Sequence, residues 1–103
     1  MSRAVRFEQG DVIDVEGSSV PLLVVSKNFF NTSEQAICCP IVSRAKSHPL
    51  HIPVRINDAE GIVLCEQMKY FDLQLRGYKK TGTIRIEAVM DITDTIQSIF
   101  DYY

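Results

Sequence analysis

The hydrophobic periodicity of the chain changes once, near Arg85, and this change limits the folds that the sequence can adopt. Before it, Leu50, Ile52, Val54 and Ile56 alternate with polar or exposed residue types, which is the period of a strand with one buried face. After it, apolar residues recur at steps of three and four, as in an amphipathic helix packed on a core. The helical stripe comprises Val89, Ile92, Ile96, Ile99, Phe100 and Tyr103. We therefore expect a mainly β domain with a C-terminal helix.

Further apolar segments between turn-forming residues are typical of strands. They cover residues 12–15, 20–25, 35–42, 62–65 and 68–75. Pro21 lacks an amide proton, so we expect it at the start or edge of its strand. Residues 26–33 and 76–82 are predicted to be loops, with Phe29 and Phe30 folded back onto the core. Closely spaced strands followed by one helix favour a small, barrel-like sheet closed by that helix.

The length of 103 residues fits a single domain covering residues 1–103. No apolar run approaches the roughly 20 residues of a membrane span, and no secretory signal is visible, so we expect a cytoplasmic protein without a membrane partner.

The three cysteines, Cys38, Cys39 and Cys65, favour buried thiols over a disulfide framework. Their spacing matches no metal site, and we expect no metal and no other cofactor.

The net charge of −2 is unevenly distributed along the sequence. Residues 41–80 carry seven basic and four acidic side chains, whereas the segments on both sides are acidic. A polyanion would be attracted to this middle segment, although a solvated loop surface explains the same imbalance. Tyr70, Phe71 and Tyr78 lie among these basic residues, a composition that is typical of single-strand nucleic-acid binding but also of a core.

Five segments, in their order along the chain, resemble the MazF/PemK toxins of type II toxin–antitoxin systems, within the MazF/CcdB-like superfamily. They are Gly10 to Ile13, the proline-led strand Pro21 to Ser26, Cys39 to Ser43, the acidic–Gln pair Glu66-Gln67, and Lys79 to Ile84. The resemblance implies an SH3-like barrel, a homodimer and neutralisation by a cognate antitoxin. It also implies metal-independent, sequence-specific cleavage of single-stranded RNA, in which the ribose 2′-hydroxyl attacks the neighbouring phosphate.

The sequence departs from that family at two positions. Active relatives have an arginine before the proline of the second strand and a threonine after the Pro-Ile pair, whereas this chain has Val20 and Val42. Valine can neither transfer a proton nor hold a phosphate. Neighbouring residues are therefore the candidates for a rearranged site. The catalytic candidates are Ser43, Arg44, His48 and Glu66, and the RNA-binding candidates are Lys46, Gln67, Lys69, Arg76, Lys79 and Lys80.

Structural interpretations of the same residues stay open. His48 precedes Pro49 and is equally typical of an exposed turn, and Glu66 is equally suited to orienting backbone amides. Three functions are compatible with the sequence: an RNA-cleaving toxin, a non-catalytic family member that binds a protein target or antitoxin, and an unrelated small β adaptor. The family interpretation requires the segments around Pro21, Pro40 and Glu66 to line one shallow groove with basic flanks.

Overall fold

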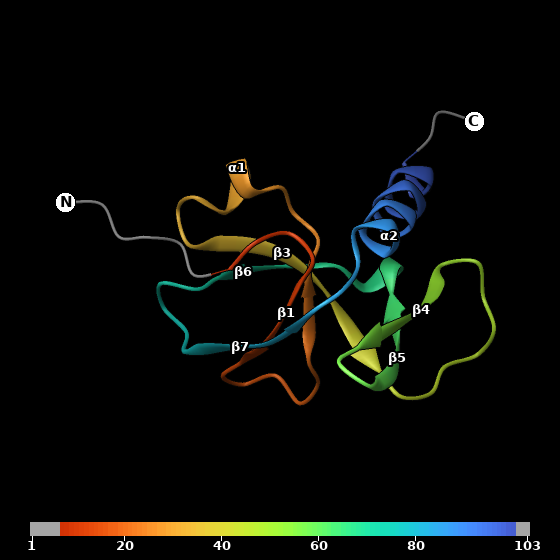
Figure 1. Cartoon of the computed structure of the whole chain (residues 1–103). Coiled ribbons are helices and arrows are strands. Elements are labelled where there is room, and N and C mark those ends of the chain that lie inside the picture. Colours follow the sequence, from red (N-terminus) through yellow and green to blue (C-terminus); the bar gives the residue numbers. More distant parts are fainter. Residues whose placement is uncertain (1–6, 101–103) are drawn as a thin grey trace.

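A computed structural model describes residues 7–100, in which seven antiparallel strands form one curled sheet (Figure 1). The strands are β1 (Asp11–Val15), β2 (Leu22–Val24), β3 (Gln35–Val42), β4 (His51–Ile56), β5 (Ala59–Leu64), β6 (Lys69–Asp72) and β7 (Tyr78–Thr83). The helices are α1 (Asn28–Asn31), the 3-10 helix η1 (Cys65–Gln67) and α2 (Ile86–Ile99). The sheet follows the order β4-β5-β3-β2-β1-β7, and β6 pairs with β3. The prediction of a mainly β, barrel-like sheet with a C-terminal helix is confirmed.

Strand β3 lies at the centre of the fold, because one of its edges pairs with two different strands, first β6 and then β5. Residues Gln35 to Cys38 pair with β6, whereas Ile41 and Val42 pair with β5. Pro40 lies between these two ladders. The amide of Ile41 points to the opposite edge, where it donates to the carbonyl of Pro21 at 2.9 Å. Successive amides of a strand alternate in direction, so the N–H that Pro40 lacks would point to the place where the two ladders part.

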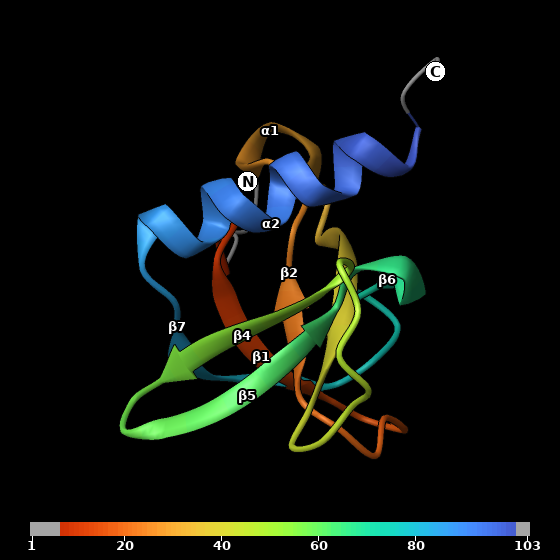
Figure 2. The same ribbon diagram turned by 90° about the vertical axis from the view of Figure 1, so that its right-hand side faces the viewer.

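The central strands bury side chains on both faces of the sheet. One cluster, which includes Cys39, Ile41 and Val63, packs against Val89 and Ile92 of α2. The other includes Ala36, Cys38 and Leu73 on the opposite face. Figure 2 shows α2 running across the first of these faces. Cys38, Cys39 and Cys65 are buried free thiols, as expected for small apolar side chains. Among the residues that the structure describes, no helix is long and apolar enough to span a membrane.

The prediction of a loop over residues 76–82 is wrong, because Tyr78 to Thr83 form the edge strand β7. This strand pairs with β1 through backbone hydrogen bonds, which do not require an apolar side-chain pattern. Its Gly82 also permits a close approach of the β4–β5 hairpin, since a Cβ atom there would lie 2.8 Å from Cγ2 of Ile56. In the β4–β5 hairpin, Asn57 and Asp58 turn the chain, and β5 begins at Ala59.

The prediction that Phe29 packs on the core is also wrong, since its side chain is 85% exposed on the short helix α1. A polar anchor holds this segment instead. The buried Asn31 accepts a hydrogen bond from the Ser26 hydroxyl at 2.6 Å and donates one to the Ser26 carbonyl at 3.1 Å. The helical stripe is buried at Val89 and Ile92 but not at Phe100, and Tyr103 lies outside the described residues.

Candidate functional site

Two surface hollows meet at Val20. The Ser43 hollow, of about 660 Å³, is lined by Val20, Pro21, Val42, Ser43 and Arg44, together with the β4–β5 turn. The Gln67 hollow, of about 320 Å³, lies on the other side of Val20 and reaches Pro40, Gln67 and Lys69. The tight turn before Val20 fixes this arrangement: Gly17 adopts a positive φ of 91°, and the Ser18 hydroxyl donates to the Val20 carbonyl at 2.8 Å.

The Gln67 hollow combines cationic, amide and aromatic groups. The guanidinium of Arg76 lies 5.5 Å from the centroid of the Phe71 ring, within the range of a cation–π contact. Lys69 is exposed on β6, and the side chain of Gln67 projects from η1. Planar groups that stack and cations that hold phosphate are what a single-stranded nucleic acid requires of a protein.

The Ser43 hollow offers a hydroxyl and a guanidinium on a mostly apolar floor. Strand β3 ends at Val42, so the alternation of strand side chains does not extend to Ser43. Val42 and Ser43 consequently both line this hollow. Arg44, in the following loop, is exposed and reaches the same hollow. The hollow can therefore hold an anionic group beside an apolar one.

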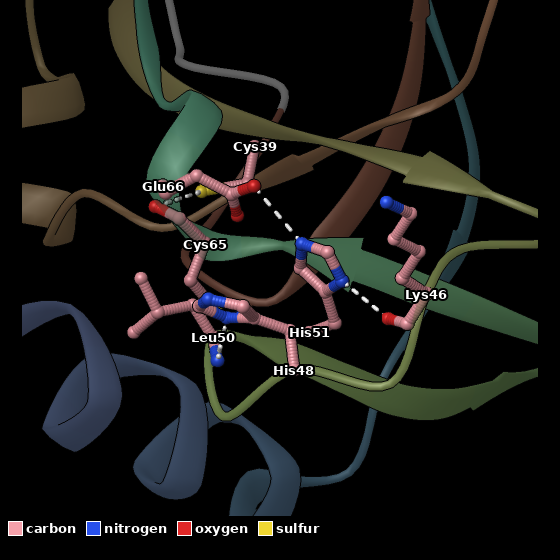
Figure 3. Close-up of polar contacts among 7 residues, drawn as sticks. All are labelled: Cys39, Lys46, His48, Leu50, His51, Cys65 and Glu66. Carbon is pink, nitrogen blue, oxygen red and sulfur yellow. Dashed lines mark hydrogen bonds and ion pairs between the residues drawn. The ribbon is translucent and has the colours of Figure 1, made fainter.

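A third polar group of side chains lies around Glu66 and includes His51, which was not among the site residues predicted from the sequence (Figure 3). Nε2 of His51 lies 2.9 Å from Oε2 of Glu66, and Nδ1 of the same ring lies 2.7 Å from the carbonyl oxygen of Lys46. The hydrogen bond to the Lys46 carbonyl and then that to Glu66 raise the pKa of His51. The hydrogen bond from His51 lowers the pKa of Glu66. Each shift favours the charged form of its group, the imidazolium of His51 and the carboxylate of Glu66.

The hairpin register could have revealed His51. The turn at Asn57-Asp58 pairs His51 with Leu64, two residues before Glu66. The alternating pattern of β4 assigned His51 to the wet face, and the sequence alone did not show which residue shares that face. His48, the histidine proposed from the sequence, is exposed, with its ring centroid 5.0 Å from that of His51. Its Nδ1 accepts a hydrogen bond from the amide of Leu50 at 3.1 Å.

The other predicted RNA-binding residues are distributed unevenly. Arg76, Lys79 and Lys80 line a further hollow of about 550 Å³ next to β7, and Arg76 is common to this hollow and the Gln67 hollow. The ammonium of Lys80 is occupied by an ion pair with Asp11 at 3.3 Å. Lys46 lies apart, in the exposed loop beside His51. Within residues 7–100, no group of three or more His, Cys, Asp and Glu side chains is placed to hold a metal ion.

The three segments on which the family interpretation depends lie side by side. Val20, Pro40 and Gln67 line the same hollow, and Lys69 and Arg76 flank it. The carboxylate of Glu66 itself turns away toward His51. Residues 5–100 match the family model described as "PemK-like, MazF-like toxin of type II toxin-antitoxin system". The chain belongs to this family.

Two curated relatives of this PemK/MazF-family protein are similar over much of its length. The Endoribonuclease toxin ChpB of Escherichia coli (strain K12) is 27% identical, covering 98% of this chain and 100% of the relative. The Endoribonuclease toxin MazF of the same strain is 26% identical, covering 67% of this chain and 63% of the relative.

Solved structures confirm the family fold. The MazE-MazF crystal structure (Form-I) from Deinococcus radiodurans has a TM-score of 0.82 at 20% identity, covering 95% of this chain and 98% of the other. An endoribonuclease in complex with its cognate antitoxin from Mycobacterial species has a TM-score of 0.77 at 16% identity, covering 94% and 97% of the two chains. Membership of the family also excludes the interpretation as an unrelated β adaptor.

The two departures from the family pattern lie together in this PemK/MazF-family protein. Val20 and Val42 both line the Ser43 hollow, with Ser43 and Arg44 beside them. A hydroxyl and a guanidinium are therefore still available in this hollow, but from positions one and two residues after Val42. The roles of Ser43, Arg44, His48 and Glu66 stay predictions.

Proposed function

We propose that this toxin-family protein is an endoribonuclease that cleaves single-stranded RNA at short sequences in the cytoplasm. In this proposal it acts as a homodimer and a cognate antitoxin neutralises it. Support comes from the family match and from the names of the relatives in that family. The observation that carries the proposal is the meeting of the two hollows at Val20, one with Lys69, Arg76 and Phe71 and the other with Ser43 and Arg44.

The proposed chemistry needs three groups around one phosphate. A base takes the proton of the 2′-hydroxyl, an acid protonates the leaving 5′-oxygen, and cations stabilise the charge that develops on the non-bridging phosphoryl oxygens. Glu66 is the candidate base: the hydrogen bond from His51 lowers its pKa and so favours the carboxylate, which faces His51 and has to turn toward the phosphate to act. Arg44 and the Ser43 hydroxyl are suited to the third role, and the exposed imidazole of His48 is the candidate acid.

The binding step requires RNA to enter as a single strand. In a duplex, base stacking hides the faces of the bases, whereas an unpaired base can stack on an aromatic or guanidinium plane. The stacked Phe71 and Arg76 groups offer such a plane beside Lys69. Double-stranded RNA should therefore be a poor substrate.

The test is incubation of purified, antitoxin-free protein with long single-stranded RNA, in EDTA, at several pH values. We expect cleavage to fragments that end in a 2′,3′-cyclic phosphate. The double variant Ser43→Ala/Arg44→Gln should lose this activity, whereas Glu87→Gln, on the exposed first turn of α2, should keep it. Absence of cleavage at every pH would refute the proposal.

A second candidate function rests on the apolar character of Val20 and Val42. A family member that has lost its RNA chemistry can still bind a protein target or an antitoxin, and these valines make the Ser43 hollow more apolar. Co-purification from the host, with identification of the retained proteins, separates the two functions. A stable protein partner together with no RNA turnover would favour this second function.

A further inference from the structure

We propose that His51 is a positioning residue whose ring ties the loop of residues 43–50 to the 3-10 helix η1, so that protonation of this ring controls the RNA-binding surface. The tie joins two segments that carry predicted site residues. The loop carries Ser43, Arg44 and Lys46, and η1 carries Glu66 and Gln67. The effect on RNA rests on the function proposed above, whereas the two contacts of the His51 ring, with Lys46 and with Glu66, do not depend on it.

Both nitrogen atoms of the His51 ring face acceptors that have no proton to give. Nδ1 faces the carbonyl oxygen of Lys46 at 2.7 Å, and Nε2 faces Oε2 of Glu66 at 2.9 Å (Figure 3). A neutral imidazole carries one N–H and can satisfy one of these acceptors, whereas an imidazolium satisfies both. The two-sided contact therefore exists in full only in the protonated ring. The ring is partly buried, with about 14% of the side chain exposed.

The loop has little else to hold it. Its residues from Ser43 to Pro49 are exposed. Between Arg44 and Ser47, the hydrogen bond accepted by the Lys46 carbonyl is the one link to another part of the protein among the described residues. Further along, Leu50 is fixed to η1 by a bond from the Cys65 amide to its carbonyl at 3.0 Å. Loss of the His51 contact would therefore free the part of the loop that carries Arg44 and Lys46.

Few charged groups lie close enough to influence the protonation of the His51 ring. Glu66 faces it from η1, and His48 lies beside it from the loop. The thiols of Cys65 and Cys39 lie near Glu66 but are neutral, because burial raises their pKa to about 11 and about 12. The charge state of the group is thus set mainly by His51 and Glu66.

The direction of the pH dependence follows from the two shifts. The pKa of His51 is raised, so the contact is complete below the ordinary pKa of histidine and is lost as the pH rises through the raised value. The pKa of Glu66 is lowered, so the contact is lost again when the pH falls through that value. The loop is expected to be most firmly held in the weakly acidic range between them and to loosen under alkaline conditions.

The first experiment tests the tie without RNA. Titration of the two histidine rings by NMR should show His51 losing its proton at a higher pH in the wild type than in Glu66→Gln, with no change in Glu87→Gln. In His51→Gln at mildly acidic pH, the backbone order parameters of Arg44 to Ser47 from 15N relaxation should fall to below about 0.6, the range of a flexible backbone, because the hydrogen bond to the Lys46 carbonyl is lost. An unchanged midpoint in Glu66→Gln, or unchanged order parameters in His51→Gln, would overturn the proposal.

The second experiment tests the consequence for RNA. Binding of a non-cleavable, 2′-O-methylated single strand of about 30 nucleotides is followed by fluorescence anisotropy from about pH 5.5 to about pH 8.5. Wild-type affinity should fall as His51 loses its proton, and Glu87→Gln should behave alike. His51→Gln should bind more weakly at acidic pH and lose most of this pH dependence. A wild-type profile in His51→Gln would refute the control of RNA binding, whereas no binding by any form would refute the proposed function and leave the NMR result standing.

Discussion

Lys80 Nζ lies 3.3 Å from Oδ1 of Asp11, and this ion pair connects the edge strand β7 to β1. The side chain of Asp11 is about 6% exposed, and its second oxygen accepts the amide of Glu8 at 2.8 Å. The register of the two strands shifts between Val12 and Ile13, which places Ile13 opposite Lys80. Lys80 therefore has a structural role that its position in a basic, glycine-punctuated segment did not reveal.

Removal of this ion pair should reduce stability. We expect Lys80→Met to lower the free energy of unfolding by about 1–3 kcal/mol, because it leaves a buried carboxylate with one fewer partner. Urea denaturation measures the change. Arg55→Gln is the matched control, since it breaks an ion pair with Glu60 that is exposed on both sides, and it should cost less than about 0.5 kcal/mol. Equal effects of the two variants would contradict a structural role for Lys80.

Restoration of the family residues should raise RNA cleavage. The variant Val20→Arg/Val42→Thr returns a guanidinium and a hydroxyl to the Ser43 hollow, where they can stabilise charge on the phosphate. We expect a rise of about 100-fold in the cleavage rate, in line with the contribution of a well-placed donor to an oxyanion. Val20→Met, which adds length without charge, should leave the rate unchanged. No rise in the double variant would place the reaction elsewhere.

The Gln67 hollow should account for part of the salt dependence of RNA binding. Each phosphate contact to a single strand contributes about 0.7 to the slope of log K against log salt. We expect Lys69→Gln and Arg76→Gln each to reduce that slope by about this amount, with a larger loss of affinity for Arg76 because its stacking on Phe71 is lost too. Lys27→Gln makes the same charge change outside this hollow and should have no such effect.

The thiols should be inert in the folded protein. Burial raises the pKa of Cys38 and of Cys39 to about 12, so neither forms appreciable thiolate at neutral pH. A disulfide-exchange reagent such as Ellman's reagent should react with none of the three cysteines under native conditions and with all three in denaturant. A fast reaction of any one thiol in the native state would show that its surroundings open.

Much of the fold could be predicted because its signals are local. The run of residues 35–42 was assigned as a strand and forms β3 over the same residues. The apolar stripe correctly predicted the helix α2, which begins at Ile86. The prediction at Phe29 failed because it assigned burial to the aromatic ring. The short helix is anchored instead by Asn31. Residue type alone does not decide which of two neighbours faces inward.

The candidate site was harder to predict. Its residues are predicted from their chemistry alone. The structure places some of them in separate hollows and places Lys46, His48 and Glu66 outside these hollows, around His51. His51 was not predicted, although its ring lies 2.9 Å from the carboxylate of Glu66. Fifteen residues separate this pair in the sequence, and the hairpin brings them together.

The sequence by itself determined the class of the fold, the position of the helix, the burial of the cysteines and the family. Each of these depends on the order and spacing of residue types, which periodicity and burial preferences express directly. Only the tertiary structure decided that residues 78–83 are a strand, that Lys80 pairs with Asp11, and that His51 rather than His48 holds Glu66. The reason is that edge pairing and polar contacts depend on which segments, distant in sequence, lie side by side, and the residue pattern within one segment does not identify its partner.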